Sequence, residues 1–109
     1  MKSARHISLA FVTVPDVKVA RQLTKRILQR KLAACVNIIS GVESHYWWQG
    51  KLDRSSELLL IIKTTSRRLA SLEKLVVTEH PYDTPEFIAF PLTSGNFKYL
   101  SWLQASVKP

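Results

Sequence analysis

The chain has 109 residues, of which 46% are hydrophobic and 22% charged, with a formal net charge of +8 and a single cysteine. These values are typical of one globular domain over residues 1–109, and they exclude disordered and disulfide-rich classes. The longest aliphatic run, residues 58–62, is far shorter than the ~20 residues of a membrane-spanning helix, so no transmembrane segment is expected. The lone cysteine fits a reducing compartment, which favours the cytoplasm.

The positive charge raises nucleic acid as a partner, but its distribution argues otherwise. Basic residues fall along one side of the first predicted helix: Lys18, Arg21, Lys25, Arg26 and Arg30. Apolar residues fall on the other side: Val17, Ala20, Leu23, Ile27 and Leu28. A solvated polar face is ordinary for an amphipathic surface helix. We therefore expect no nucleic-acid partner.

The first half of the chain predicts a strand, a helix and a long hairpin. Two basic residues precede the apolar run of residues 6–14, as in a signal peptide, but Pro15-Asp16 follows directly, so a buried strand is favoured. Asp16 is the predicted N-cap of a helix over residues 17–31. A long strand over residues 33–48 bends or bulges at Gly41. Gln49-Gly50 makes a tight turn into a returning strand over residues 51–65.

The second half predicts a helix, an edge strand and a closing helix. Ser66 is the expected cap of the helix, whose inner face carries Leu69, Leu72, Leu75 and Val76. Residues 85–92 form a strand, and Pro91 places it at a sheet edge because proline lacks a ladder donor. Residues 96–107 form a short helix. Its predicted inner residues are Phe97, Leu100 and Leu103, with Trp102 as a further candidate.

This order, βαββαβα, is the ferredoxin-like pattern of an α+β sandwich with an added C-terminal helix. The hairpin between the second and third strands is long for so small a domain. A chain of this length folds to a radius of gyration of about 13 Å, whereas residues 34–48 span roughly 50 Å when extended at ~3.3 Å per residue. The hairpin should therefore extend beyond the domain and carry Tyr46, Trp47 and Trp48 into solvent.

Both faces of the predicted sheet are apolar. In the third strand Leu58, Leu60 and Ile62 point one way, and Leu59 and Ile61 the other. Two helices cover only one face of a two-layer sandwich. The favoured cover for the other face is the sheet of a neighbouring subunit, in an oligomer with closed symmetry. The competing interpretation is that the hairpin or the third helix covers part of that face.

Strong chemical motifs are few. Three glycines cannot build a phosphate-binding loop, and Cys35 lies in an apolar strand where a free thiol is usually inert. His80, with Glu57 and Glu86 at the starts of two strands, is the best candidate for a metal site, to which a thiol would add affinity. The ordinary alternative is a histidine at a helix C-terminus. In "EHPYDTPEF" the two prolines predict a stiff connection.

Several segments occur in one order along nearly the whole chain: "LAACVNI", Tyr46-x-Trp48-x-Gly50-Lys51, "ELLLIIKT" and "HPYDTPEFIAFPL…GNFKYLSWL". Together they resemble the CutA family of divalent cation tolerance proteins. The resemblance implies a ferredoxin-like subunit in a homotrimer similar to the PII signalling proteins. It also implies tolerance of copper and other divalent cations, with copper binding attributed to some members. It implies no enzymatic reaction and no organic cofactor.

Carried over to this chain, the family motif falls on Tyr46, Trp48, Gly50, Lys51, Glu57, Lys63, His80, Tyr82, Pro85, Glu86 and Trp102. Cys35 stands at the family's "AAC" cysteine, so the metal ligands to consider are His80, Glu57 and Cys35. Two departures weaken the copper prediction. Val12 replaces a cysteine found in some members, and residues 53–55 are less acidic than is usual. A PII-like module that binds a small anion through Lys63, Arg67 and Arg68 is the alternative.

Overall fold

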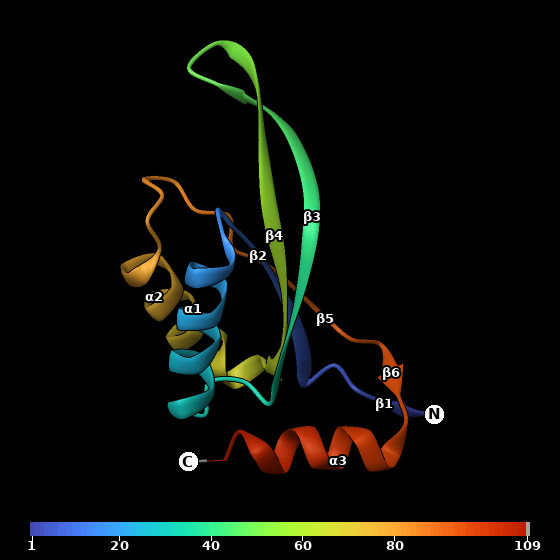
Figure 1. The fold of residues 1–109 in the computed structure, drawn as a ribbon. Helices are drawn as coiled ribbons and strands as arrows, with labels where there is room; N and C mark the ends of the chain where they lie inside the picture. The colour runs from blue at the N-terminus through green and yellow to red at the C-terminus, as the bar shows by residue number, and fades with distance from the viewer. Residues whose placement is uncertain (109) are drawn as a thin grey trace.

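The computed structural model describes residues 1–108, which form a four-stranded antiparallel sheet covered on one face by two helices (Figure 1). The strands are β2 (Ile7–Val14), β3 (Cys35–Trp48), β4 (Lys51–Thr65) and β5 (Ile88–Pro91), in the order β3-β4-β2-β5. The predicted α+β class is confirmed. β5 is shorter than the predicted residues 85–92, but it lies at the edge of the sheet and pairs with β2, as Pro91 predicted.

Helices α1 (Val17–Gln29) and α2 (Leu69–Glu79) form the covering layer. Asp16 caps α1, because its Oδ1 accepts a hydrogen bond of 2.9 Å from the Val19 amide. Alternating residues of β2 and β4 point toward this layer and are fully buried with the inner residues of both helices. This core includes Val12, Leu60 and Leu72. Its burial is the main stabilisation of the subunit.

Two predicted helix termini are wrong. α1 ends at Gln29 rather than Lys31, because Lys31 turns to a positive φ of 54° and leaves the helical conformation. Ser66 does not cap α2. It begins a short 3₁₀ turn, η1 (Ser66–Arg68), and its hydroxyl bonds instead to the Ser8 hydroxyl at 2.8 Å and the Arg5 carbonyl at 3.2 Å. Tertiary partners have replaced the local bond that the sequence suggested.

The third helix, α3 (Phe97–Ser106), lies across the end of the sheet far from the hairpin (Figure 1). Leu100 and Leu103 pack against Ile7 in a second small core. Phe97 and Trp102 are not inward: their exposed fractions are 60% and 48%, because the helix meets the sheet along only one narrow stripe. A small additional sheet, β1 (Lys2–Ser3) with β6 (Ser94–Gly95), lies beside this helix and was not predicted.

The hairpin of β3 and β4 extends beyond the rest of the molecule, as predicted (Figure 1). The radius of gyration is 14.6 Å and the longest dimension is 44 Å. The register of β3 shifts between Ile39 and Val42, so the expected bulge is present around Gly41, whose φ is +75°. Gln49 and Gly50 both have positive φ and close the hairpin. A primed turn of this kind matches the twist of its two strands.

The sheet face opposite α1 and α2 is only partly covered. α3 covers the end of this face near Ile7. This agrees in part with the competing interpretation, in which the hairpin or the third helix covers part of the face. Beyond it lies what we call the open face, an apolar surface on all four strands: Leu9, Phe11, Ile39, Leu59, Ile61, Ile88 and Phe90. Its residues are half-buried or exposed in the single chain. An apolar surface of this extent usually marks an interface.

Candidate functional site

The hairpin and the α2–β5 connection enclose a cleft of about 790 Å³. We call it the hairpin cleft, and its lining is Thr13, residues 43–48, Asp53, Glu57, residues 82–84 and Glu86. In Figure 1 the α2–β5 connection rises from the helix layer toward the hairpin, which brings together segments distant in sequence. The volume lies within the range of small-molecule sites.

The hairpin cleft is acidic although the protein is strongly basic. Five of the eight acidic residues of the chain line it: Glu43, Asp53, Glu57, Asp83 and Glu86. No Lys or Arg of residues 1–108 belongs to the lining. The lining residue that can gain a positive charge is His45, whose Nε2 lies 2.6 Å from Glu43 Oε2. Opposite charges are thus segregated, and the cleft favours cations.

Glu57 and Tyr82 form the central contact of the cleft. Glu57 is only 8% exposed, and the Tyr82 hydroxyl donates a hydrogen bond of 2.8 Å to its Oε2. Burial and the adjacent Glu57 carboxylate raise the pKa of Tyr82 well above its usual range, so the phenol keeps its proton and remains a donor. Within residues 1–108 Glu57 has no basic side chain at ion-pair distance.

Glu86 adds a second carboxylate close to the first. Partial burial raises the pKa of Glu86, the nearby Glu57 carboxylate raises it further, and a hydrogen bond from Thr13 opposes both effects. A cation bound beside Glu86 would offset the repulsion that it feels from the Glu57 carboxylate.

His80 holds the α2–β5 connection in place. It is buried at the C-terminus of α2, where its Nε2 lies 2.8 Å from the Thr13 carbonyl and its Nδ1 lies 3.1 Å from the Tyr82 amide. A carbonyl oxygen accepts and an amide N–H donates, so Nε2 carries the proton and Nδ1 accepts. Both ring nitrogens are therefore occupied. The interaction places Tyr82, and through it Glu57, at the cleft.

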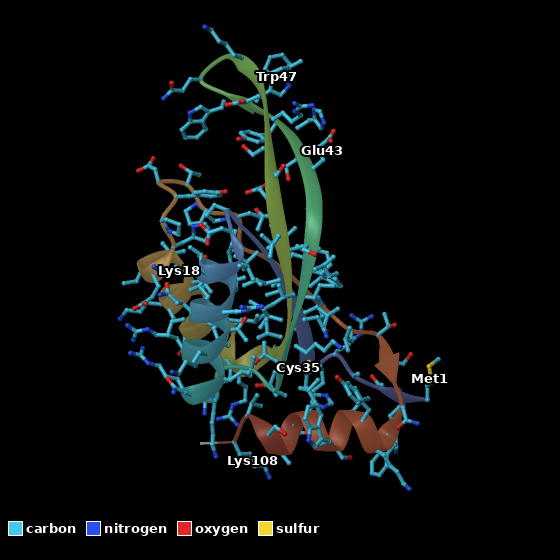
Figure 2. All side chains as sticks on the ribbon, viewed as in Figure 1. Met1, Lys18, Cys35, Glu43, Trp47 and Lys108 are labelled. Carbon is cyan, nitrogen blue, oxygen red and sulfur yellow. The ribbon has the colours of Figure 1, made fainter. Side chains whose placement is uncertain are left out.

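The structure does not bring all the predicted metal ligands together. Cys35 pairs with Lys63 near the end of the sheet opposite the hairpin, whereas Glu57 pairs with Val42 beyond the bulge. Figure 2 shows this separation along β3, with Cys35 far from Glu43 and Trp47. In the part of the chain that the structure describes, no three His, Cys, Asp or Glu side chains are grouped to hold a metal ion. His80, Glu57 and Cys35 thus do not form a site within one chain.

The other predicted motif residues divide between the two ends of the sheet. Tyr46, Trp48, Tyr82 and Glu86 line the hairpin cleft. Gly50 and Lys51 close the hairpin. Pro85 lies in the connection between Thr84 and Glu86. Lys63 lies over the Tyr99 ring, with Nζ 5.7 Å from its centroid, and Trp102 packs on the same ring.

Sequence reasoning missed the acidic partners Glu43, Asp53 and Asp83. They come from three separate segments, and no spacing rule connects them. A signal was nevertheless present, because few acidic residues occur in the chain and most follow the bulge at Gly41.

Comparison with known proteins agrees with this architecture. The family described as "CutA1 divalent ion tolerance protein" matches residues 8–106. The chain belongs to the CutA1 family. Protein CutA 1, chloroplastic, from Oryza sativa subsp. japonica is 48% identical over 100 residues, which are 92% of this chain and 56% of that protein. The divalent-cation tolerance protein CutA of Thermus thermophilus is 44% identical over 96 residues, 88% of this chain and 93% of that one.

The fold is also that of the CutA1 family. The crystal structure of CutA1 from Oryza sativa superimposes with a TM-score of 0.92 at 45% identity, covering 98% of each chain. The present chain spans about half the length of the plant and animal CutA1 relatives it matches, 56%, 55% and 55% for the rice, Arabidopsis and human proteins. No helix within residues 1–108 is long and apolar enough to cross a bilayer.

Proposed function

We propose that this chain acts in divalent-cation tolerance as a non-enzymatic homotrimer that binds Cu²⁺ or a similar ion weakly in the hairpin cleft. The observation that carries the proposal is that five carboxylates line one cleft whose lining, within residues 1–108, includes no Lys or Arg. Membership of the CutA1 family supports a role in tolerance of divalent ions. We propose the cytoplasm as its compartment, in keeping with a single free cysteine.

Glu57 and Glu86 are the proposed carboxylate ligands. They are close enough to raise the pKa of Glu86, and the Tyr82 hydroxyl fixes the orientation of Glu57. His80 can join them only by giving up its bond to Thr13 or to Tyr82. One chain supplies an incomplete set of ligands, so further ligands would come from a neighbouring subunit. An incomplete and partly open site is consistent with weak binding.

The open face supports the proposed trimer. Its apolar side chains are half-buried or exposed within residues 1–108, and the hairpin extends beyond the body of the subunit. A ferredoxin-like subunit in a PII-like ring would bury this face against its neighbours. Sedimentation equilibrium at micromolar concentration should give three times the mass of the chain. A single-chain mass would contradict the trimer and leave the acidic cleft to be tested separately.

The alternative is a PII-like module for a small anion, and the charges weigh against it. The hairpin cleft repels anions. Of the predicted anion ligands, Lys63 lies over Tyr99 and Arg68 donates to the Val107 carbonyl from Nε and Nη2 at 3.3 and 3.2 Å. Neither side chain lines the cleft. A melting shift with nucleotides or phosphorylated metabolites in chelator buffer would favour this alternative.

Calorimetric titration of chelator-treated protein with Cu²⁺ tests the proposed metal site. We expect saturable binding that weakens about tenfold or more in Glu57→Gln, since a charged ligand is replaced by a neutral one of the same shape. The matched control is Glu73→Gln, on the exposed side of α2. His80→Ala reports whether the histidine takes part. Equal binding by wild type and Glu57→Gln would remove the cleft from the metal site.

A further inference from the structure

The outer side of α1 carries a row of positive charges. The inner residues of this helix pack into the core, so its opposite side faces solvent. Lys18, Arg21 and Lys25 are exposed there, and we call them the basic ridge; Lys18 is labelled in Figure 2. Arg30 and Lys31 continue the charge at the C-terminal end of the helix. This side lies opposite the open face, so association through the open face leaves it accessible.

The chain supplies no carboxylate partner to the basic ridge. Asp16, at the start of α1, accepts its hydrogen bond from the Val19 amide. Glu79, at the end of α2, pairs with Arg26 at 3.1 Å. Within residues 1–108 no ion pair includes any of the three ridge residues. Their charges are therefore available to a partner outside the chain.

The positions of these charges work against the stability of the helix. Lys18 and Arg21 are three residues apart, and Arg21 and Lys25 are four apart, so each pair consists of like-charged neighbours on the helix surface. Lys18 also lies in the first turn, where the helix dipole disfavours a cation, and that turn holds no acidic residue. An ordinary solvated face accounts for the exposure of these residues but not for their uncompensated repulsion. Such breaks with local design rules are expected at functional sites.

The composition of the helix layer indicates which polyanion fits the ridge. Neither α1 nor α2 contains an aromatic residue. The layer therefore lacks the rings that stack on the bases of single strands and the aromatic anchors of protein interfaces. The apolar side of α1 is buried in the core, so the helix cannot insert it into a bilayer. The phosphate backbone of a duplex requires only a row of cations.

We propose that the basic ridge binds the phosphate backbone of a nucleic-acid duplex without reading its sequence. From Lys18 to Arg30 the helix extends roughly 18 Å at ~1.5 Å per residue. This length matches about five phosphates of one strand, at roughly 3.4 Å of duplex axis each. The net charge of +8 per chain adds attraction at longer distance. The proposal replaces the expectation from the sequence that the chain has no nucleic-acid partner, and it goes beyond the proposed role in cation tolerance.

The test is fluorescence anisotropy of a labelled DNA duplex titrated with the assembled protein in chelator buffer. With three to five phosphate contacts, the affinity should fall roughly 40- to 500-fold between about 50 and 200 mM NaCl. Two duplexes of unrelated sequence should bind alike, because the ridge contacts only phosphates. Absence of saturable binding at the lower salt concentration, or a strong preference for one of the two sequences, would overturn the proposal.

Two variants with the same change in net charge locate the site. The first is Lys18→Gln/Arg21→Gln/Lys25→Gln, and the second, Lys51→Gln/Arg54→Gln/Lys98→Gln, removes exposed cations of the hairpin and α3. The first should weaken duplex binding about tenfold or more and lower the salt slope by about three. The second should keep the affinity within about threefold, since distant charges are screened. Equal losses in the two variants would show that net charge alone drives binding, and would overturn the proposal.

Stability provides a second readout on the ridge. At low ionic strength the first variant should unfold at a higher urea concentration than wild type, because its like charges no longer repel each other. A lower urea midpoint would give these residues a structural role and contradict the proposal.

Other polyanions are the competing partners. Vesicles containing phosphatidylserine test a bilayer, and polyglutamate tests an acidic protein segment. If either one binds through the ridge and the duplex does not, the ridge belongs to that partner and the proposal is wrong. Copper binding at the hairpin cleft is measured separately, so failure of one proposal leaves the other to stand on its own result.

Discussion

The Tyr82 hydroxyl lies 2.8 Å from Glu57 Oε2 and donates a hydrogen bond across 25 positions of sequence. This bond joins the α2–β5 connection to the base of the hairpin, so it holds the two walls of the hairpin cleft together. His80 supports it from behind, since its ring accepts the Tyr82 amide and is itself anchored to Thr13 of β2.

Tyr82→Phe should destabilise the protein by about 1–3 kcal/mol, because a buried carboxylate loses its donor while the ring remains. The measurement is urea unfolding at fixed protein concentration. Tyr99→Phe is the control, because Tyr99 is exposed on α3, and we expect a change within about 0.5 kcal/mol there. Equal losses in the two variants would show that the bond to Glu57 contributes nothing of its own.

Stability should depend on pH through Glu86. Its pKa is raised in the folded state, so the folded protein holds the Glu86 proton more tightly than the unfolded chain does. The free energy of unfolding therefore falls as pH rises from the ordinary glutamate range through the raised pKa. Glu86→Gln removes this fall, so the variant should gain stability relative to wild type at about pH 8 compared with about pH 4.

Urea midpoints across this range check the Glu86 prediction. Glu73→Gln, on an exposed position of α2, should follow the wild-type curve. A constant difference between Glu86→Gln and wild type at every pH would contradict the assigned role. A larger gain in stability of Glu86→Gln over wild type at low pH than at high pH would also contradict it.

The sequence predicted the features that local chemistry decides. Pro91 placed β5 at the sheet edge, and Gln49 and Gly50 set the hairpin turn, because each acts through its own backbone. The extension of the hairpin followed from strand length alone. Ser66 shows the opposite case. Its hydroxyl was predicted to cap the following helix, but it forms hydrogen bonds with the Ser8 hydroxyl and the Arg5 carbonyl, which are distant in the sequence.

The site was predictable only in part, because its contacts depend on tertiary structure. Glu57, Tyr82 and Glu86 were identified as motif residues, but the bond from Tyr82 to Glu57 depends on how the α2–β5 connection folds back. That path is set by His80, whose expected role was metal binding and whose two nitrogens instead hold backbone groups. The separation of Cys35 from the cleft likewise follows from sheet register rather than from any local pattern.

The open face should control assembly. Ile61 lies in the middle of this face on β4, next to Phe11 of β2 and Asn37 of β3. A charge there would be buried against a neighbouring subunit, so Ile61→Asp should dissociate the assembly to single chains. Light scattering after gel filtration measures the mass.

Two further variants make the assembly experiment specific. Phe90→Asp, on the edge strand of the same face, should also dissociate the assembly and disturbs the subunit core less. Val77→Asp places the same charge on the exposed side of α2 and should leave the mass unchanged. Unchanged mass in folded Ile61→Asp and Phe90→Asp would exclude the open face as the interface.

The same substitution, threonine to valine, is expected to change the stability of the protein in opposite directions at Thr24 and at Thr64. Thr24 Oγ1 is buried in α1, and it has no hydrogen-bond partner in residues 1–108. Thr64 Oγ1 is also buried, but it donates a bond of 2.6 Å to the Leu32 carbonyl. Valine has nearly the shape of threonine without the hydroxyl. Thr24→Val should therefore stabilise the protein by about 1 kcal/mol, and Thr64→Val should destabilise it by about 1–3 kcal/mol. Urea unfolding of both variants measures the difference, and shifts of the same sign would show that hydrogen bonding of the hydroxyl does not decide the outcome.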